Sequence, residues 1–290
     1  MRIDSHQHYW KIARGDYGWI TPELPVLYRD FLPEHLEPHL ARHRLDGTIV
    51  IQAAPTLAET EFILSLSEQT ASICGVVGWI DLAVPSYREQ YAAFSKHPKF
   101  AGVRIMIQDM KNPGDLLEPP FMEAFHWMEE QGIAVDVLVT AEQLDVVVEL
   151  LERVPRLRCV IDHIAKPQIA AGIMEPWQSR IAAIAAHSGV YCKLSGMVTE
   201  AEHHGWRTSD FLPYARHVIG CFGPERVMFG SDWPVCLLSA SYAEVVDVLQ
   251  QCLPEGYTEE EQERLFGRNA VNFYRLQDRT QLEMELKKHE

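Results

Sequence analysis

Several features that would define other protein classes are missing from this sequence. No apolar stretch approaches the roughly 18 residues that a membrane-spanning helix needs, and the start MRIDSHQHYW lacks the apolar core of a secretory signal. No Gly-x-Gly-x-x-Gly turn follows an early strand, which disfavours an open dinucleotide-binding sheet. The six cysteines form no Cys-x-x-Cys pair. We therefore expect reduced, mostly buried thiols and a cytoplasmic protein.

Positive charge is also scarce, with 26 Lys and Arg against 41 Asp and Glu, for a net charge of −15. Such a surface repels phosphate backbones and anionic lipid headgroups. We therefore predict neither a nucleic acid nor a membrane as partner, and a small molecule is left as the expected ligand. The 290 residues, 47% of them hydrophobic, can bury a core that needs no disulfide or structural metal.

Short runs rich in Val and Ile recur along the chain, and each precedes a segment long enough for a helix. They predict strands at 2–6, 47–52, 74–80, 101–107, 133–139, 157–163, 189–194 and 226–231. Nearly continuous apolar runs, as at 135–139, are typical of parallel strands that are covered on both faces. Eight strands alternating with helices predict a single-domain α/β fold, a closed (β/α)8 TIM barrel over 1–276, with a charged tail at 277–290. An open doubly wound sheet is the main alternative.

Three helices carry clear start signals. The segment 141–153 follows Thr140, a suitable N-cap, and has apolar residues spaced three and four apart. A similar pattern covers 241–253. Thr258 precedes three glutamates, which favour the positive end of a helix dipole, so it should open the last helix, running towards Tyr274.

Two histidines stand at the end of the first predicted strand, in the stretch Asp4–His8. Alternate residues of a strand point to the same face, so His6 and His8 lie about 6–7 Å apart along it. Two imidazoles at this spacing can converge on one cation or one substrate. An incidental pair of surface histidines is the alternative.

A carboxylate, Asp232, follows the eighth predicted strand within Phe229–Pro234. It can bind a metal, act as general base on water, or both; capping of a turn is the alternative. In a closed barrel the first and eighth strands are neighbours, so His6 and Asp232 should meet although they are far apart in the sequence. The two motifs support each other.

The sixth predicted strand ends in Asp162–Pro167. His163 can bind metal, polarise a carbonyl or hold the attacking water, or it can be a structural histidine. Lys166 can recognise an anionic or hydroxylated substrate. Arg104 lies within an apolar strand, where substrate binding and a buried ion pair are equally consistent.

The remaining candidates are weaker. Asp136 favours an ordinary buried, hydrogen-bonded role, while Lys193 on the seventh strand could reach the pocket mouth or extend outwards. His204 and Trp206 follow that strand, and Trp206 could stack on a sugar ring or anchor a loop. Trp10 and Trp233 are further candidates for an apolar face against a sugar.

These motifs together resemble a known family. The segments His6–His8, His163–Pro167 and Phe229–Pro234 look like the amidohydrolase superfamily, in its amidohydrolase-related branch of sugar-lactone hydrolases. Stretches between Leu194 and Tyr242 are similar to its L-fuconolactonase and L-rhamnonolactonase members. The resemblance extends from Met1 to about Leu276.

The resemblance implies a TIM barrel that hydrolyses a carbonyl compound, with His6 and His8 as metal ligands, His163 on strand six, and Asp232 as acid/base. Many amidohydrolases also carry a bridging Lys or Glu on strand four and a His on strand five. Here these strands offer Arg104 and Asp136. We therefore expect one divalent ion, Zn²⁺ before others, held by His6, His8 and Asp232, or metal-free activity, and not a two-metal centre.

The function predicted from these residues is hydrolysis of a sugar-acid lactone, of the L-fuconolactone or L-rhamnonolactone type, to the free acid. Asp232 activates water, and the oxyanion is stabilised by the bound cation or by His163. The substrate contacts are assigned to Arg104, Lys166, Trp10, His204, Trp206 and Trp233. An aromatic or dicarboxylate lactone hydrolase, or a decarboxylase, on the same barrel is the alternative, and a non-catalytic sugar-binding barrel is a third possibility. The lactone's stereochemistry, the metal and the oligomeric state stay open.

Overall fold

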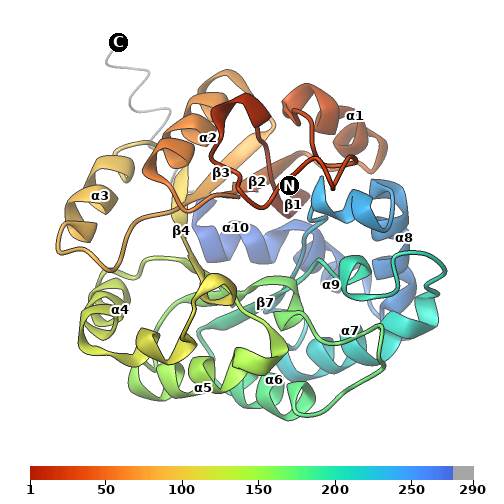
Figure 1. The fold of residues 1–290 in the computed structure, drawn as a ribbon. Helices are drawn as coiled ribbons and strands as arrows, with labels where there is room; N and C mark the ends of the chain where they lie inside the picture. Colours follow the sequence, from red (N-terminus) through yellow and green to blue (C-terminus); the bar gives the residue numbers. More distant parts are fainter. Residues whose placement is uncertain (277–290) are drawn as a thin grey trace.

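A computed structural model describes residues 1–276, and the predicted tail 277–290 lies outside the described residues. Eight parallel strands pair in chain order, which confirms the predicted barrel (Figure 1). They are β1 (Ile3–Gln7), β2 (Gly47–Ile51), β3 (Ile73–Gly78), β4 (Phe100–Met106), β5 (Val135–Leu138), β6 (Cys159–Ile161), β7 (Val190–Leu194) and β8 (Val227–Phe229). Each lies within a few residues of its predicted range.

Helices surround the strands, as Figure 1 shows. They are α1 (Pro33–Arg42), α2 (Leu57–Gln69), α3 (Tyr87–Phe94), α4 (Pro119–Gln131), α5 (Leu144–Arg153), α6 (Trp177–Ala185), α7 (Thr208–Phe222), α8 (Tyr242–Cys252), α9 (Glu259–Glu263) and α10 (Asn269–Tyr274). None of the helices within 1–276 combines the length and apolar character needed to span a bilayer.

The predicted helix starts are present, but two of the helices differ from the prediction. Ser241 and Thr258 each form a capping box at the start of α8 and α9. After Thr140 the chain first makes a 3-10 turn and then α5. The last helix is not continuous: a wide turn at Arg264–Arg268 separates α9 from α10. At that turn a Cβ on Gly267 would lie 2.1 Å from the Met1 carbonyl oxygen. Only glycine therefore lets the backbone before β1 pack this closely against the turn.

The helix α10 closes the N-terminal end of the barrel. Its residues Phe273 and Tyr274 belong to one buried cluster with Ile3, Val77 and Met228 from three strands. In Figure 1 α10 runs across the middle of the ring of strands. The barrel interior is therefore packed at this end, and ligand access is left to the carboxyl ends of the strands, as is general for this architecture.

Candidate active site

Closure of the barrel brings the two distant sequence motifs together. The Asp232 amide donates to the His6 carbonyl oxygen at 2.8 Å, and the His8 amide donates to the Trp233 carbonyl oxygen at 2.8 Å. Buried Asp4 on β1 accepts from the Ser231 amide at 2.9 Å. Asp232 itself has a φ of +56°, in the left-handed region. The segment after β8 is thus held against β1 on both sides of Asp232.

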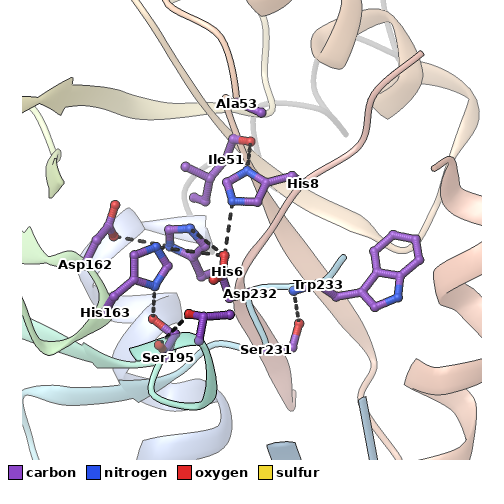
Figure 2. Close-up of polar contacts among 12 residues, drawn as sticks. His6, His8, Ile51, Ala53, Asp162, His163, Ser195, Ser231, Asp232 and Trp233 are labelled. Atoms are coloured by element: carbon purple, nitrogen blue, oxygen red, sulfur yellow. Dashed lines mark hydrogen bonds and ion pairs between the residues drawn. The ribbon is translucent and has the colours of Figure 1, made fainter. Parts of the chain in front are cut away.

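Three imidazoles surround the Asp232 carboxylate, and we call these four residues the imidazole cluster (Figure 2). Asp232 Oδ1 lies 3.3 Å from His8 Nε2, 3.9 Å from His6 Nε2 and 3.9 Å from His163 Nε2. All four side chains are buried. Burial acts to raise the pKa of Asp232, but the facing His163 and His8 outweigh it, so this pKa lies below its ordinary value of 3.8. Asp232 is therefore an anion at neutral pH.

His8 and His6 are oriented from behind. His8 Nδ1 lies 2.8 Å from the Ile51 carbonyl oxygen. Since that oxygen only accepts, Nδ1 carries a hydrogen and Nε2 faces the Asp232 carboxylate. His6 Nε2 has no hydrogen-bond partner among the described residues. Burial lowers the pKa of His6 well below its ordinary value, so its imidazole is neutral.

This donor set fits a divalent cation. The ligand atoms of His6, His8 and Asp232 lie within 4.8 Å of one another. A tetrahedral zinc with bonds of about 2.0–2.2 Å spaces its ligands about 3.3–3.6 Å apart, close to the 3.3 Å between His8 Nε2 and Asp232 Oδ1. A carboxylate with an imidazole nitrogen 3.3 Å away, and the unpartnered His6 Nε2 beside them, are groups that a cation would bind.

His163 lies on a turn that the sequence did not reveal. The sixth strand stops at Ile161, two residues before the predicted end, and Asp162–Ala165 form a tight turn in which His163 has a φ of +53°. His163 Nδ1 lies 3.0 Å from Ser195 Oγ. A Cβ on Gly196 would lie 2.6 Å from His163 Nδ1, so glycine leaves the room for the ring. Ser195 and Gly196 thereby direct His163 Nε2 towards Asp232.

Beneath the imidazole cluster lies a set of buried ion pairs, the charge network of Arg104, Asp136, Asp162 and Lys193. Arg104 Nε donates to Asp162 Oδ2 at 3.0 Å, which supports the buried-pair interpretation of this arginine. Lys193 is fully buried and bonds Asp136 inside the barrel. Neither predicted location of Lys193, at the pocket mouth or facing outwards, is correct, since its side chain points into the closed barrel.

A cavity of about 200 Å³ opens beside the imidazole cluster. Its lining brings together the polar groups predicted at four strand ends: His8, Arg104, His163, Lys166 and Asp232. Lys166 also pairs with Glu200 at 3.3 Å. The other lining residues are Trp19, Ala53, Met106, Gln108, Asp109, Leu138 and Val235.

The predicted sugar-facing tryptophans lie elsewhere, which corrects their assignment. Trp10 is fully buried, and its Nε1 donates to the Arg29 carbonyl oxygen at 2.8 Å. Trp233 is buried edge-on against Phe31, with ring centroids 5.1 Å apart. The long segment after β1 folds back so that Trp10 pairs with Phe31, and both indoles become part of the wall behind the site.

The two residues assigned from the segment after β7 do not line this cavity either. Trp206 Nε1 donates to the Ser239 carbonyl oxygen at 3.0 Å, and its ring packs on Phe211. Of the two interpretations of Trp206, these contacts support the one in which it anchors a loop. His204 is exposed on the same segment.

Trp19 is the aromatic residue that sequence reasoning missed. It lines the cavity and remains 41% exposed. Its Nε1 donates to the Ala53 carbonyl oxygen at 2.9 Å, which fixes the indole at the cavity mouth. The only signal in the sequence was a tryptophan in a long segment between strand and helix, and nothing there distinguishes it from Trp10.

Comparison with known proteins agrees with this geometry. A family model described as Amidohydrolase matches residues 3–276. The chain belongs to the amidohydrolase family. It is 40% identical to an L-fucono-1,5-lactonase of Burkholderia ambifaria over 95% of this chain and 96% of that protein. It is 37% identical to an L-fucono-1,5-lactonase of Burkholderia multivorans, over 95% and 96%.

Among solved structures, a zinc-bound amidohydrolase from Burkholderia multivorans is similar, with 37% identity and a TM-score of 0.89. The similarity covers 94% of this chain and 99% of that one. The predicted superfamily is thereby confirmed. A 2-pyrone-4,6-dicarboxylic acid hydrolase of Pseudomonas putida shares the fold, at 20% identity and a TM-score of 0.75.

Proposed function

We propose that this amidohydrolase opens sugar-acid lactones, of the L-fucono-1,5-lactone type, to the free acids. The observation that carries the proposal is an anionic Asp232 that is ringed by three imidazoles at a closed, buried end of a cavity. Two relatives of 37–40% identity over nearly the whole chain are L-fucono-1,5-lactonases. A general base beside polarising groups is what attack of water on an ester carbonyl requires.

In the proposed reaction Asp232 takes a proton from water while the water oxygen bonds to the lactone carbonyl carbon. The carbonyl π electrons move to oxygen, and His163 stabilises that oxyanion. The Ser195 hydroxyl can donate to His163 Nδ1, which places the imidazole hydrogen on Nε2, facing the cavity. When the tetrahedral species collapses, the ring C–O bond breaks and Asp232 returns the proton to the leaving oxygen. One water is consumed and one hydroxy acid forms.

A divalent ion, Zn²⁺ before others, would be held by His6, His8 and Asp232. Bound there, it supplies Lewis acidity for the carbonyl or for water. The protein's own part is to keep the donors fixed: His8 through Ile51, and His6 through Lys193 and Asp162, which lie 3.1 Å and 3.2 Å from its Nδ1.

The cavity's cations favour a neutral sugar lactone over the dicarboxylate or aromatic-acid alternative. Arg104 already bonds Asp162 and the Gln52 carbonyl oxygen, and Lys166 pairs with Glu200. Among the described residues, no other Lys or Arg lines this cavity. Without an uncommitted cation, a substrate carboxylate would enter unpaired, at a cost in free energy. We assign Lys166 to substrate hydroxyls and Trp19 to the ring face.

The proposal includes a reducing cytoplasmic location and a small-molecule partner. All six cysteines are unpaired, and four of them are buried, as expected for thiols that never meet an oxidising compartment.

Acid release in a weakly buffered indicator solution tests the function. We expect turnover of 6-deoxyaldonolactones well above the spontaneous rate, and slower or no turnover of 2-pyrone-4,6-dicarboxylate. Asp232→Asn serves as the matched control. If none of a panel of aldonolactones is hydrolysed faster by the wild-type protein than by buffer, the assignment fails. If the dicarboxylate is the preferred substrate, the alternative replaces it.

A further inference from the structure

The Lys193 ammonium occupies a site whose neighbours are metal-ligand groups. Its Nζ bonds the Asp136 carboxylate and lies 3.1 Å from Asp162 Oδ1 and 3.1 Å from His6 Nδ1. Asp136 is further fixed by the Tyr274 hydroxyl of α10, at 2.9 Å. The side chains of Lys193, Asp136, Asp162 and His6 are all fully buried.

The Asp136 and Asp162 carboxylates form a second candidate ligand set, on the Nδ1 side of the His6 imidazole. His6 offers Nε2 to Asp232 and Nδ1 to Asp162. The carboxylates of Asp136 and Asp162 are the anionic groups of this set, and both are in contact with the Lys193 ammonium. His6 Nδ1 lies 3.2 Å from Asp162 Oδ1; when Nε2 offers its lone pair to an ion beside Asp232, Nδ1 carries the hydrogen that this carboxylate accepts.

The two positions differ in what faces the ligands. On the Nε2 side of His6, the nitrogen has no hydrogen-bond partner among the described residues. On the Nδ1 side the ammonium sits among two carboxylates, one of which also pairs with Arg104. The positive charges of Lys193 and Arg104 equal the negative charges of Asp136 and Asp162, so the charge network is balanced without any ion.

We propose that the Lys193 ammonium is the permanent occupant of a second cation position, and that it limits the chain to one exchangeable divalent ion. A side chain provides the charge that an ion would otherwise provide, and unlike an ion it does not dissociate. Removal of the ammonium with retention of its neighbours should therefore create a site for a divalent ion. The inference rests on the proposed function only for the single ion beside Asp232, and it is independent of which lactone is hydrolysed.

The test counts bound metal. Untagged full-length wild type and Lys193→Met are stripped with chelator and dialysed against Co²⁺. Bound cobalt is then measured by elemental analysis and by its visible spectrum. Methionine is an unbranched side chain one atom shorter than lysine, and it has no charge. We expect Lys193→Met to bind about one more Co²⁺ per chain than the wild type, with new absorption bands.

Two control variants tie the extra ion to this position. Lys193→Arg keeps a cation and should bind as much cobalt as the wild type. Lys193→Met/Asp162→Asn removes one ligand and should lose the extra ion. Because each count is a difference from the wild type, exposed histidines contribute equally to all chains. Loss of lactone turnover, which would sink the proposed function, leaves this difference unaffected.

Folding is followed by circular dichroism in the same samples. A Lys193→Met chain that folds only when Co²⁺ is added supports the proposal, because the ion then replaces the ammonium. The proposal is overturned if folded Lys193→Met binds no more cobalt than the wild type. It is likewise overturned if the wild type already holds the additional ion, or if the variant stays unfolded in saturating Co²⁺.

Discussion

The imidazole cluster and the charge network lie next to each other in the same barrel, yet they differ in how their polar groups are paired. In the charge network every described charge has an opposite charge in contact, as in Arg104 with Asp162 and Lys193 with Asp136. In the imidazole cluster a carboxylate faces three imidazoles, and His6 Nε2 has no hydrogen-bond partner in the described chain. The lower layer is satisfied by the protein itself. The upper layer leaves His6 Nε2 for a bound ion or substrate, in line with the active site that we propose.

The largest expected effect is a loss of lactone hydrolysis when the imidazole cluster, and not the charge network, is changed. Asp232→Asn keeps the shape but removes the base, so kcat should fall by about 10²–10⁴-fold while the protein stays folded. Lactone hydrolysis and a thermal melt measure the two. Wild-type turnover in Asp232→Asn would remove this residue from the mechanism and erase the distinction between the layers.

The second prediction concerns the contribution of the charge network to stability. Lys193→Met leaves two buried carboxylates with one cation, and without added metal the free energy of unfolding should drop by about 3–5 kcal/mol. Urea unfolding in the presence of chelator measures this, and Lys193→Arg is the charge-matched control. An unchanged midpoint in Lys193→Met would show that the charge network does not depend on pairing.

The third prediction concerns the dependence of activity on acid pH, which tests Asp232 in the imidazole cluster. Asp232 acts as an anion, and its pKa is held below 3.8 by His163 and His8 against the effect of burial. Activity should therefore persist as pH falls to the ordinary carboxyl range and decline only as pH drops through that lowered pKa, tenfold per unit at the limit. The pH profile of kcat/KM measures it. An acid limb centred near pH 6 would contradict the assignment of Asp232 as the base.

A smaller effect is expected where the cluster is held in place. Ser195→Ala removes the hydroxyl beside His163 Nδ1. A net hydrogen bond of about 1 kcal/mol corresponds to a decrease of about fivefold in kcat, with KM nearly unchanged because Ser195 is not in the cavity lining. Steady-state kinetics beside Ser209→Ala, an exposed control, measure it. A rise in KM alone would place Ser195 in substrate binding.

The smallest prediction concerns the rim of the cavity. Trp19→Leu should raise KM by about 3- to 10-fold with little change in kcat, because aromatic contacts contribute about 0.5–1.5 kcal/mol. Trp206→Leu is the matched control and should leave KM unchanged, since Trp206 is bonded to Ser239 away from the cavity. The reverse result would restore the sequence-based assignment of Trp206 and remove Trp19.

The features that could be predicted from the sequence are those that depend on interactions between residues close together in the chain. Strand positions followed from local apolar runs, and the β1 and β8 motifs were paired correctly because closure of a barrel makes its first and last strands neighbours. The turn that carries His163 was not visible, because its positive φ angles have no local sequence signal and the groups against the ring, Ser195 and Gly196, come from the segment after β7. Nor could the sequence choose among tryptophans, since which ring faces a cavity depends on the folding of the segment between β1 and α1.

The sequence by itself determined the barrel and the family, and it predicted His6, His8, His163 and Asp232 as the reactive set, because strand periodicity and the ends of strands are local properties. The tertiary structure alone decided the partners of each charge. Asp136 and Lys193, on separate strands, became a buried pair under His6, and Trp19 took the place at the cavity that Trp10 was expected to hold. The physical reason is that burial and the energy of a charge depend on distances across the barrel, and residue order does not contain those distances.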